Sequence, residues 1–504
     1  MLTAPHLNYA LLAPILIVLG GALLGVLVEA FVGKAYRSRL QVSIALLAVV
    51  AAFVQLIRVR TQTSNTAAVN SVSMDGAGIY IQLIILALSF VGLLLIADTD
   101  NFTAQASSIP GSTEEASAIA AGRQQTEVFP LTLFAIAGML LFPVATDFIT
   151  LFVALEVLSL PLYLMAGLSR RRRLLSQEAA LKYFLLGAFS SAFFLFGAAF
   201  LYGYSGSLSL SGIADGIHSS GANSVFLLIG LIFVSVGLLF KVGAVPFHSW
   251  TPDVYQGAPT PITGFMAACT KAAAFGAMLR IFYVGFNDAQ WSWRIIFSTI
   301  AVITMVFGAI AAIVQRDVKR TLAFSSITHA GFIMISVIAL SHDGLSAALF
   351  YFIAYGFATL GAFAIITLVR DSSGEITDLN RWSGLGKRSP LVAGAFSLFL
   401  LSFGGIPLTA GFIGKFTVFT ASYNAGNINL VVFGVLTSAV ALFFYLKIIL
   451  TLFFGEVNND TLTVVIPSIL TRIAIAICVA VTIVLGVYPS IILNSAQTFA
   501  TFIR

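Results

Sequence analysis

The chain has 504 residues, of which 59% are hydrophobic and only 9% are charged, and its formal net charge is +6. Soluble domains carry about 25% charged residues, so this composition excludes an ordinary soluble protein. Apolar runs of about 20 residues, the length that spans a bilayer, recur from end to end. We therefore expect an all-α polytopic membrane protein in a lipid bilayer, with one membrane domain and no soluble domain.

About fourteen apolar segments of spanning length follow one another, separated by polar, glycine-rich or charged breaks. The first segment is long and lacks a basic leader, so we expect it to be retained as a span rather than cleaved as a signal peptide. The breaks 58–76 and 98–126 are rich in Ser, Thr, Ala, Gln and Asn and are expected to be exposed loops. The predicted segments are 8–31, 41–57, 77–97, 128–144, 147–168, 179–203, 225–247, 260–284, 295–314, 321–340, 344–369, 391–420, 428–454 and 465–489.

Basic residues in the short loops predict the orientation, because such residues remain on the cytoplasmic side. With the N-terminus outside, about fifteen basic residues fall in inner loops and about four in outer loops. The inner set is Lys34, Arg37, Arg39, Arg123, Arg170, Arg171, Arg172, Arg173, Arg316, Lys319, Arg320, Arg370, Arg381, Lys387 and Arg388, and the outer set is Arg58, Arg60, Arg294 and Arg504. We therefore expect both termini to face outward. Topology alone explains the arginine run, so no nucleic-acid partner is expected.

Two segments contain helix breakers: 225–247, with Gly243 and Pro246, and 391–420, with the string GGIPLTAGFIGK. Paired interrupted helices in corresponding positions of two halves indicate an inverted repeat with an ion site. Each interrupted segment is the fourth of five, and an odd number of spans turns the second unit upside down. The expected regions are an N-terminal three-helix region with polar loops at 1–126, five-helix units at 127–290 and 291–455, and a C-terminal helix at 456–504.

Ionisable residues inside the predicted spans are functional hypotheses, because one near the bilayer centre costs at least about 2.5–3.5 kcal/mol. Glu156 and Lys271 lie about ten and eleven residues into their segments, close to the middle at about 1.5 Å per residue. By hydropathy alone the ammonium groups of Lys182, Lys241, Lys415 and Lys447 could instead snorkel to the interface. Arg280 and Arg472 are expected to be interface anchors.

Lysine suits proton transfer in this setting. Burial disfavours its charged form and a nearby carboxylate favours it, so a Glu that moves toward or away from a Lys can load or release a proton. Arginine stays protonated and could not serve in this way. His248 and His329 titrate near neutral pH and are candidate intermediate stations. Each alone would be explained by a packing hydrogen bond, but together with a buried acid, several lysines and broken helices they favour a proton pathway.

Signals for a resident redox centre or nucleotide site are missing from the sequence. The two cysteines, Cys269 and Cys478, are far apart, lie in predicted spans and form no CxxC pair. The string GLGKRS lacks the phosphate-loop pattern. We expect no metal and no cofactor in this chain, so any electron transfer would use cofactors held by other subunits.

Three strings are specific enough to indicate a family: FKVGAVPFHSWTPDVYQGAPTP at 240–261, CTKAAAF around Lys271, and QRDVKRTLAFSSITHAGF at 315–332. They resemble the antiporter-like membrane subunits of respiratory complex I and the related multisubunit sodium/proton antiporters, over about residues 127–455. LEVLSLPLYLMAG at 155–167 and GGIPLTAGFIGKF at 404–416 look most like the subunit N branch of the bacterial-type NADH:quinone oxidoreductases, the counterpart of mitochondrial subunit 2.

The resemblance implies a fourteen-helix fold with two inverted five-helix units, and proton translocation driven by electron transfer from NADH to quinone in partner subunits. It implies Glu156 and Lys241 as a charge pair with Lys182 as an auxiliary charge beside them, Lys271 as the central relay and Lys415 as the terminal proton site. His248 and His329 match histidine positions of the family.

The same resemblance places FMN, iron–sulfur clusters, NADH and quinone in partner subunits. The partners would be other membrane and peripheral subunits of complex I, including neighbouring antiporter-like subunits, in a bacterial inner membrane. Two alternatives stay open. One is a subunit of a cation/proton antiporter or of a membrane-bound hydrogenase, and the other is a purely structural anchor.

Overall fold

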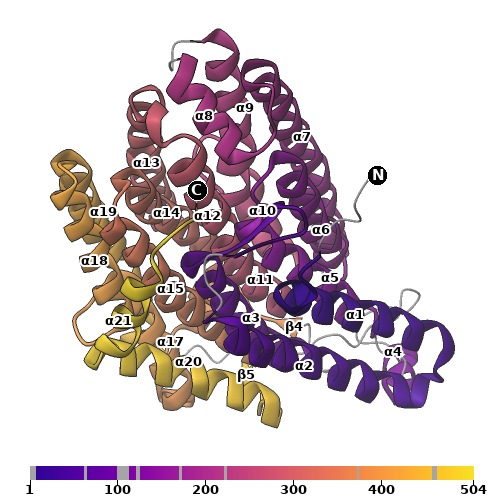
Figure 1. Cartoon of the computed structure of the whole chain (residues 1–504). Helices are drawn as coiled ribbons and strands as arrows, with labels where there is room; N and C mark the ends of the chain where they lie inside the picture. The colour runs from indigo at the N-terminus through magenta and orange to yellow at the C-terminus, as the bar shows by residue number, and fades with distance from the viewer. Residues whose placement is uncertain are drawn as a thin grey trace.

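The computed structural model describes residues 7–61, 65–98, 113–120, 125–169, 173–220, 224–371, 374–456 and 462–503, and most of them are helical (Figure 1). Parts of the expected loops 58–76 and 98–126 lie outside the described residues. So do five of the basic residues used to predict the orientation: Arg123, Arg170, Arg171, Arg172 and Arg504. The expectation of exposure was wrong for 72–76, which are buried because they pack against the bundle at the start of α3.

Twelve helices in the described part of the chain are long and apolar enough to cross a membrane, and two shorter apolar helices lie at 128–144 and 390–404. Together they match the fourteen predicted segments in order, which confirms the all-α polytopic fold. The long helices are α1 (Tyr9–Phe31), α2 (Lys34–Val59), α3 (Gly76–Ile96), α6 (Phe148–Ala166), α7 (Arg173–Ser205), α9 (Val225–Val242), α13 (Gln290–Ile313), α14 (Val318–Ala339), α15 (His342–Leu368), α19 (Ile428–Phe454), α20 (Ile469–Val487) and the composite span Thr260–Gly285.

The composite span joins α11 (Thr260–Phe265) and α12 (Lys271–Arg280) through a π-helical turn, η3 (Met266–Thr270), and ends in a second one, η4 (Ile281–Gly285). The remaining helices are α4 (Thr113–Ala120), α5 (Val128–Leu141), η2 (Phe142–Val144), α8 (Leu210–Ser220), α10 (Trp250–Gly257), η5 (Asn287–Ala289), η6 (Leu379–Trp382), α16 (Leu385–Arg388), α17 (Pro390–Gly404), α18 (Ala410–Asn424) and α21 (Ser490–Phe499).

Short antiparallel strands between the helices form two small sheets. β1 (Asn65–Ala67) pairs with β2 (Val72–Met74), and β3 (Val369–Asp371) lies between β4 (Gly374–Glu375) and β5 (Thr463–Val464).

Both predicted interruptions are present. α9 ends at Gly243, whose φ is +74°, and α17 ends at Gly405, whose φ is +78°. These left-handed conformations suit glycine because it has no Cβ to clash with the backbone. After each break the chain runs without α-helix before the next helix begins, so both discontinuous helices are confirmed. The division into two inverted five-helix units stays a prediction.

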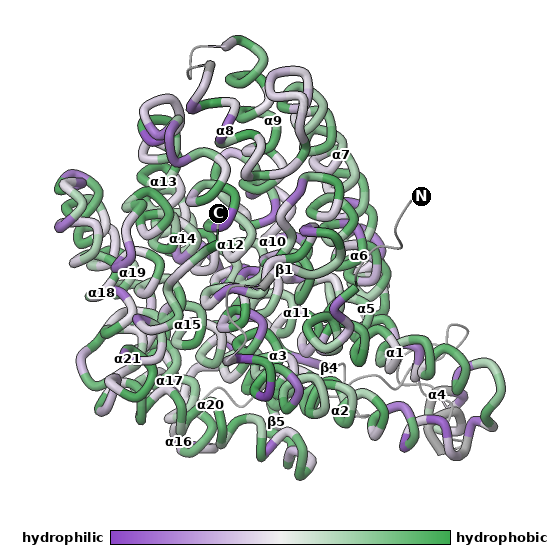
Figure 2. The backbone as a smooth tube through the Cα atoms, in the orientation of Figure 1, coloured by the Kyte–Doolittle hydropathy of each residue, from purple (hydrophilic) through white to green (hydrophobic). Residues whose placement is uncertain are grey.

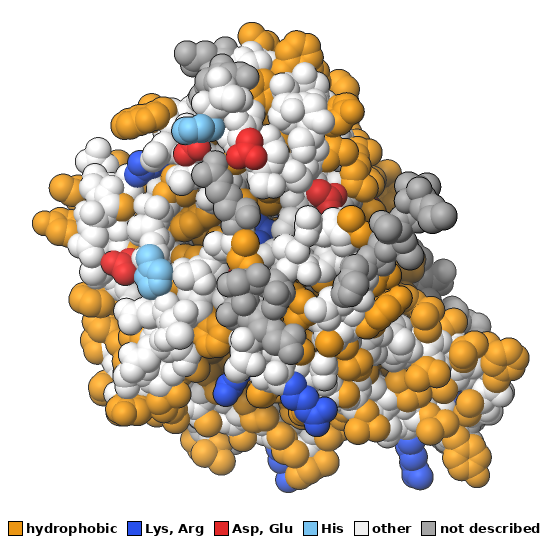
Figure 3. Space-filling view, in the orientation of Figure 1, with side chains coloured by type: hydrophobic (Ala, Val, Ile, Leu, Met, Phe, Trp, Pro, Cys, Tyr) orange, Lys and Arg blue, Asp and Glu red, His pale blue; other side chains and the backbone are white. Residues whose placement is uncertain are grey.

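The helices divide into a buried centre and an apolar periphery. The windows that best fit a span in Thr260–Gly285, α14 and α15 are entirely buried, whereas only a third of the corresponding windows in α1, α2, α19 and α20 is buried. Figure 2 shows hydrophobic residues along all the long helices, and Figure 3 shows hydrophobic side chains around the flanks with few charged groups between them. A helix that is apolar on every face belongs inside a bundle, so the central helices form the protein core.

Both ends of the described chain lie on one side of the bundle. Gln55, near the end of α2, donates a hydrogen bond to the carbonyl of Ala10, and the backbone N–H of Ile503 donates to Asp75, just before α3. We call this the terminal side. In Figure 1 the tail after α21 runs across the molecule to α12, where the Phe502 ring lies 4.7 Å from the Arg280 guanidinium.

The prediction that Arg280 is an interface anchor was wrong. Its side chain is fully buried, and its guanidinium binds both oxygens of Asp75 at 2.7 Å while Nε donates to the carbonyl of Pro143. A salt bridge between residues 205 positions apart therefore ties the start of α3 to the end of α12.

Candidate functional site

Lys241 lies on the last turn of α9, just before the helix break, and is 4% exposed. Its Nζ donates to Ser159 Oγ at 2.7 Å and to the Tyr183 hydroxyl at 3.4 Å. The rings of Tyr163 and Tyr183 lie 5.7 and 5.3 Å from the ammonium, close enough for cation–π attraction. Lys241 therefore points into the protein and does not snorkel to the interface.

Glu156 lies on α6, one turn before Ser159, which contacts Lys241. Its Oε1 is buried and has no hydrogen-bond partner within the described residues. Glu156 and Lys241 make no direct ion pair, since the Lys241 ammonium is hydrogen-bonded to Ser159 and Tyr183 instead. The structure therefore brings the predicted pair into one neighbourhood without a direct contact, and the hydroxyl of Ser159, one turn after Glu156, holds the Lys241 ammonium.

Lys182 belongs to a different cluster. Its ammonium lies 2.6 Å from both Glu178 and Asp253, and Asp253 also binds Arg320 at 2.8 Å. The Lys182 side chain is 40% exposed, so these ion pairs lie at the surface of the chain. Partial burial acts to raise the pKa of Asp253, but the hydrogen bonds and charges of Lys182 and Arg320 outweigh it and hold that pKa below its ordinary value. The auxiliary charge is thus engaged with these acids and not with Glu156.

Lys271 begins α12, directly after the π-helical turn, and is 6% exposed. Its ammonium donates to the carbonyl of Ser326 and, at 2.6 Å, to the Oγ of the same residue. Ser326 Oγ lies 3.3 Å from the Tyr255 hydroxyl, and the Tyr355 ring lies 5.5 Å from the ammonium. Lys271, like Lys241, is held by neutral groups at the centre of the bundle.

His329 lies on α14, one turn after Ser325 and Ser326, and is 3% exposed. Its Nδ1 is 2.6 Å from the Tyr351 hydroxyl and its Nε2 is 3.4 Å from the Tyr445 hydroxyl. Tyr445 in turn is hydrogen-bonded to Ser325. The His329 imidazole thus lies between a hydroxyl on α15, that of Tyr351, and one on α19, that of Tyr445.

Lys415 lies on α18, after the second helix break, and is 4% exposed. Its ammonium donates to Ser438 Oγ at 2.8 Å and to the carbonyl of Gly404 at 3.1 Å. The break in α17 thus supplies a carbonyl for the lysine, as expected where an interrupted helix lines a polar site. The Phe332 ring, 4.8 Å away, covers another side of the ammonium.

His248 lies apart from this series, in the link between α9 and α10. Its ring packs edge-on against Phe307 with centroids 4.6 Å apart, and its Nδ1 is buried without a partner among the described residues. The structure therefore groups Glu156, Lys241, Lys271, His329 and Lys415 in the protein interior, and leaves His248 and Lys182 at its edges.

Sequence reasoning missed the neutral partners. Ser and Tyr in an apolar span are usually packing residues, so nothing in the local pattern separates these from the other hydroxyls of the chain. The hydroxyl groups that contact the lysines or His329, directly or through one neighbour, are those of Ser159, Tyr183, Tyr255, Ser325, Ser326, Tyr351, Ser438 and Tyr445.

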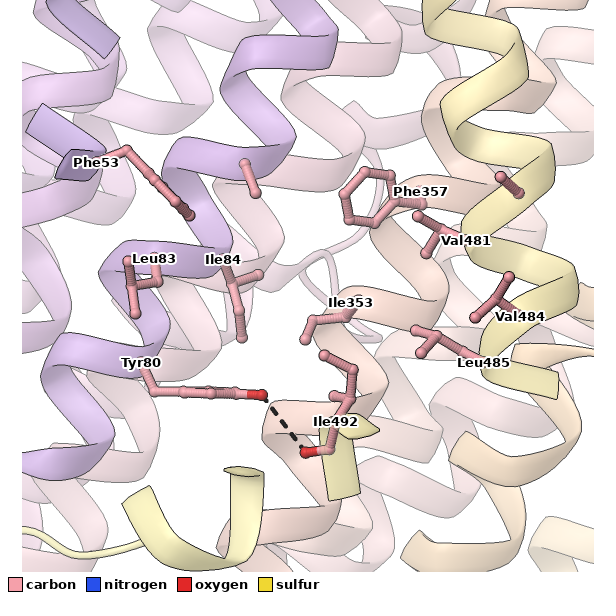
Figure 4. Close-up of a pocket in the computed structure, with 12 residues that line it drawn as sticks. Phe53, Tyr80, Leu83, Ile84, Ile353, Phe357, Val481, Val484, Leu485 and Ile492 are labelled. Carbon is pink, nitrogen blue, oxygen red and sulfur yellow. Dashed lines mark hydrogen bonds between the residues drawn. The ribbon is translucent and has the colours of Figure 1, made fainter. Parts of the chain in front are cut away.

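No group of three or more His, Cys, Asp or Glu side chains able to hold a metal is found among the described residues. Cys269 and Cys478 are both buried, and neither forms a disulfide bond. An apolar cavity of about 430 Å³ lies between α2, α3, α15, α20 and α21 (Figure 4). Its one polar contact among the residues drawn is the hydrogen bond from the Tyr80 hydroxyl to the carbonyl of Ile492, so it is separate from the lysine series.

Comparison with known proteins identifies the family. Residues 145–441 match the model of the family described as NADH:quinone oxidoreductase/Mrp antiporter, TM. The chain is 53% identical to NADH-quinone oxidoreductase subunit N of Rhodococcus opacus, over 99% of this chain and 97% of the relative. It is 49% identical to the protein of the same name from Mycobacterium tuberculosis, over the full length of both.

Solved structures agree in fold. A chain of respiratory complex I from Thermus thermophilus with bound aureothin is 30% identical and superposes with a TM-score of 0.78, covering 95% of this chain and 98% of that one. A chain of the Mrp complex from a Dietzia species has a TM-score of 0.77 over 98% and 97% of the two chains, but at 22% identity it shows the fold alone. The chain belongs to the NADH:quinone oxidoreductase/Mrp antiporter membrane family and, within it, to the subunit N branch of the NADH-quinone oxidoreductases.

Proposed function

We propose that this chain is the proton-translocating subunit N of an NADH:quinone oxidoreductase. The observation that carries the mechanism is the series Lys241, Lys271 and Lys415, three buried lysines whose direct hydrogen-bond partners are hydroxyls and carbonyls. A buried ammonium held by a carboxylate would stay charged, whereas one held by neutral groups can exchange its proton at a smaller cost. Such lysines can be loaded and emptied.

Glu156 supplies the movable negative charge in this proposal. Because Glu156 lies on α6 and Lys241 on α9, a small shift of either helix changes the distance from the Glu156 carboxylate to the Lys241 ammonium. A closer carboxylate favours the protonated lysine, and a more distant one favours release toward Lys271. The break after α9 gives this end of the helix freedom to shift.

Between Lys271 and Lys415 the carriers are neutral groups. Ser326 contacts Lys271, and its chain neighbour Ser325 contacts Tyr445, which in turn contacts His329. Each of these groups can accept one proton and donate another. Lys415 is the terminal proton site. Regions 127–290 and 291–455 act as the two five-helix units, between the N-terminal region 1–126 and the C-terminal helix region 456–504.

The chain works in this proposal with partners that carry the redox chemistry. FMN, iron–sulfur clusters, NADH and quinone belong to other membrane and peripheral subunits, and neighbouring antiporter-like subunits continue the lysine series. The names of the relatives, at 49–53% identity, support the assignment of this chain to complex I. The chain lies in a bacterial inner membrane in this proposal, with both termini outward, and the common side of the two ends and the count of basic residues support that orientation.

The test is made on the assembly purified in mild detergent and reconstituted in vesicles. Co-purification of flavin and iron–sulfur subunits with NADH:quinone activity supports the proposal, and Lys271→Ala should abolish proton uptake into the vesicles. Arg39→Gln, which removes an exposed cation from α2, is the matched control and should pump normally. Sodium-dependent exchange without NADH:quinone activity would instead assign the chain to a cation/proton antiporter. If the single variants Lys271→Ala and Glu156→Gln both pumped protons normally, the chain would be a structural anchor.

A further inference from the structure

A second cavity, of about 480 Å³, lies at the end of the bundle opposite to the terminal side. It is bounded by the end of α13, the start of α14, η6 and α19, and polar and apolar groups both contribute to its wall. The lining residues are Ala312, Ile313, Val314, Gln315, Arg316, Thr321, Leu379, Asn380, Trp382, Phe444, Lys447, Ile448, Thr451 and Leu452. This is the side on which the basic loops cluster, so it is the predicted cytoplasmic side.

The cavity carries two cations and no acidic side chain in its lining. Arg316 and Lys447 are both exposed, and neither side chain has a hydrogen-bond or ion-pair partner within the described residues. By contrast Arg37, Lys182, Arg280, Arg320 and Arg381 all have carboxylate partners. Two unpaired cations at one opening create a positive potential that favours an anion.

Nearby carboxylates are already engaged. Asp317, next to Arg316, caps α14 through the N–H groups of Lys319 and Arg320 and also accepts hydrogen bonds from Gln256 and Thr377. Asp378 caps η6 by accepting from the N–H of Asn380. These acids therefore stabilise helix ends, and the cations of the cavity remain available to a ligand.

Most of the rest of the wall is apolar and opens to the outer surface at the end of α13. Ile313 and Val314 close α13, and Phe444, Ile448 and Leu452 form one face of α19. Val314 is 73% exposed at the outer surface of the bundle, where acyl chains would contact it. A ligand that fills the cavity must therefore combine an anionic head with a hydrocarbon tail.

We propose that this cavity binds an anionic phospholipid of the cytoplasmic leaflet. Its phosphate contacts Arg316 and Lys447, Asn380 faces the headgroup, and an acyl chain lies along α13 and α19. Basic pockets between membrane helices on the cytoplasmic side suit anionic headgroups in this way. Free phosphate shares the headgroup chemistry but would leave the apolar wall uncovered.

The lipid site is independent of the lysine series. Lys447 is two residues after Tyr445 on α19, which places the two side chains about 200° apart around the helix. Tyr445 is buried against Ser325 and His329, whereas Lys447 is exposed. The site thus goes beyond the proposed proton pathway and would survive if that pathway were disproved.

The test uses the full assembly in nanodiscs that contain phosphatidylcholine with or without phosphatidylglycerol. Native mass spectrometry counts the retained lipids, and a phosphatidylglycerol with a photoreactive acyl chain maps the site. We expect crosslinks to 312–316 and 444–452. Arg316→Gln or Lys447→Gln should weaken phosphatidylglycerol retention about fivefold, or about 1 kcal/mol, and the double variant about 30-fold. Arg39→Gln, which removes an exposed cation elsewhere on the same side, should have no effect.

Three results would overturn the proposal. The first is equal retention of phosphatidylglycerol by wild type and the double variant, and the second is crosslinks that fall on other helices. The third is inorganic phosphate that blocks crosslinking at the cavity while the protein retains phosphatidylglycerol and phosphatidylcholine equally well. The last result would assign the cations to free phosphate. Because Arg316 and Lys447 are exposed, both variants should assemble, and their NADH:quinone activity in phosphatidylcholine discs checks this.

Discussion

Replacing Asp75 by Asn should destabilise the protein strongly, because it leaves a buried guanidinium without its counter-charge. Arg280 is fully buried and Asp75 is 1% exposed, and they share two hydrogen bonds of 2.7 Å. Breaking a buried pair by removing one partner costs about 3–5 kcal/mol. An unfolding entropy of about 2.1 cal/mol/K per residue amounts to about 1 kcal/mol/K for a chain of this length, so we expect the apparent Tm to fall by about 3–5 °C.

The assay is thermal denaturation of the purified assembly, followed by the loss of monodisperse protein. Arg294→Gln is the matched control, since this arginine is only part-buried and its contacts are the amide side chains of Gln290 and Asn427. It should shift Tm by less than about 1 °C. The double variant Asp75→Ala/Arg280→Met should be more stable than Arg280→Met with Asp75 intact, because no buried charge is then left unpaired. A Tm for Asp75→Asn equal to that of wild type would refute the reasoning.

Three further changes probe the site and its surroundings. Lys271→Arg keeps the charge but cannot release a proton, so coupled proton uptake should fall about tenfold or more while Tm changes little; normal uptake would exclude Lys271 as a carrier. Gly405→Ala places a Cβ on a residue with positive φ, 3.0 Å from the Lys415 side chain. It should lower the free energy of unfolding by about 1 kcal/mol and impair proton pumping. Gly394→Ala, on α17 with open space around the added Cβ, is the control and should change neither quantity. Asp253→Asn should lower the free energy of unfolding by at most about 1 kcal/mol near neutral pH. Because the pKa of Asp253 is lowered in the folded protein, the difference in stability from wild type should vanish as pH falls through that pKa. A stability difference that persists in acid would contradict this reasoning.

The spans and both breaks could be predicted from the sequence because they depend on local properties. Hydrophobic length decides whether a segment crosses a bilayer, and Gly243 and Gly405 end their helices through their own backbone conformations. The partners of charged groups are not local. Lys182 binds Asp253, 71 residues away, and Arg280 binds Asp75, 205 residues away. Depth along a helix could not reveal either contact, and Arg280 was therefore misplaced at the interface.

Depth also left Lys241 undecided, since a lysine near a helix end can snorkel. The structure decides it through packing, because α6 and α7 place Ser159 and Tyr183 against the ammonium.

The imbalance of charges in the spans does foreshadow the chemistry of the site. The predicted spans contain several lysines but only one acid near mid-span, Glu156. Most of those lysines therefore have no carboxylate to pair with if they are buried. A buried ammonium still needs hydrogen-bond acceptors, and in an apolar bundle only hydroxyls, a histidine and carbonyls freed by helix breaks remain. The structure supplies a hydroxyl to each of Lys241, Lys271 and Lys415, and a carbonyl at a helix break to Lys415. Which of the 14 tyrosines and many serines would do so depends on helix packing, and no spacing along the chain encodes it.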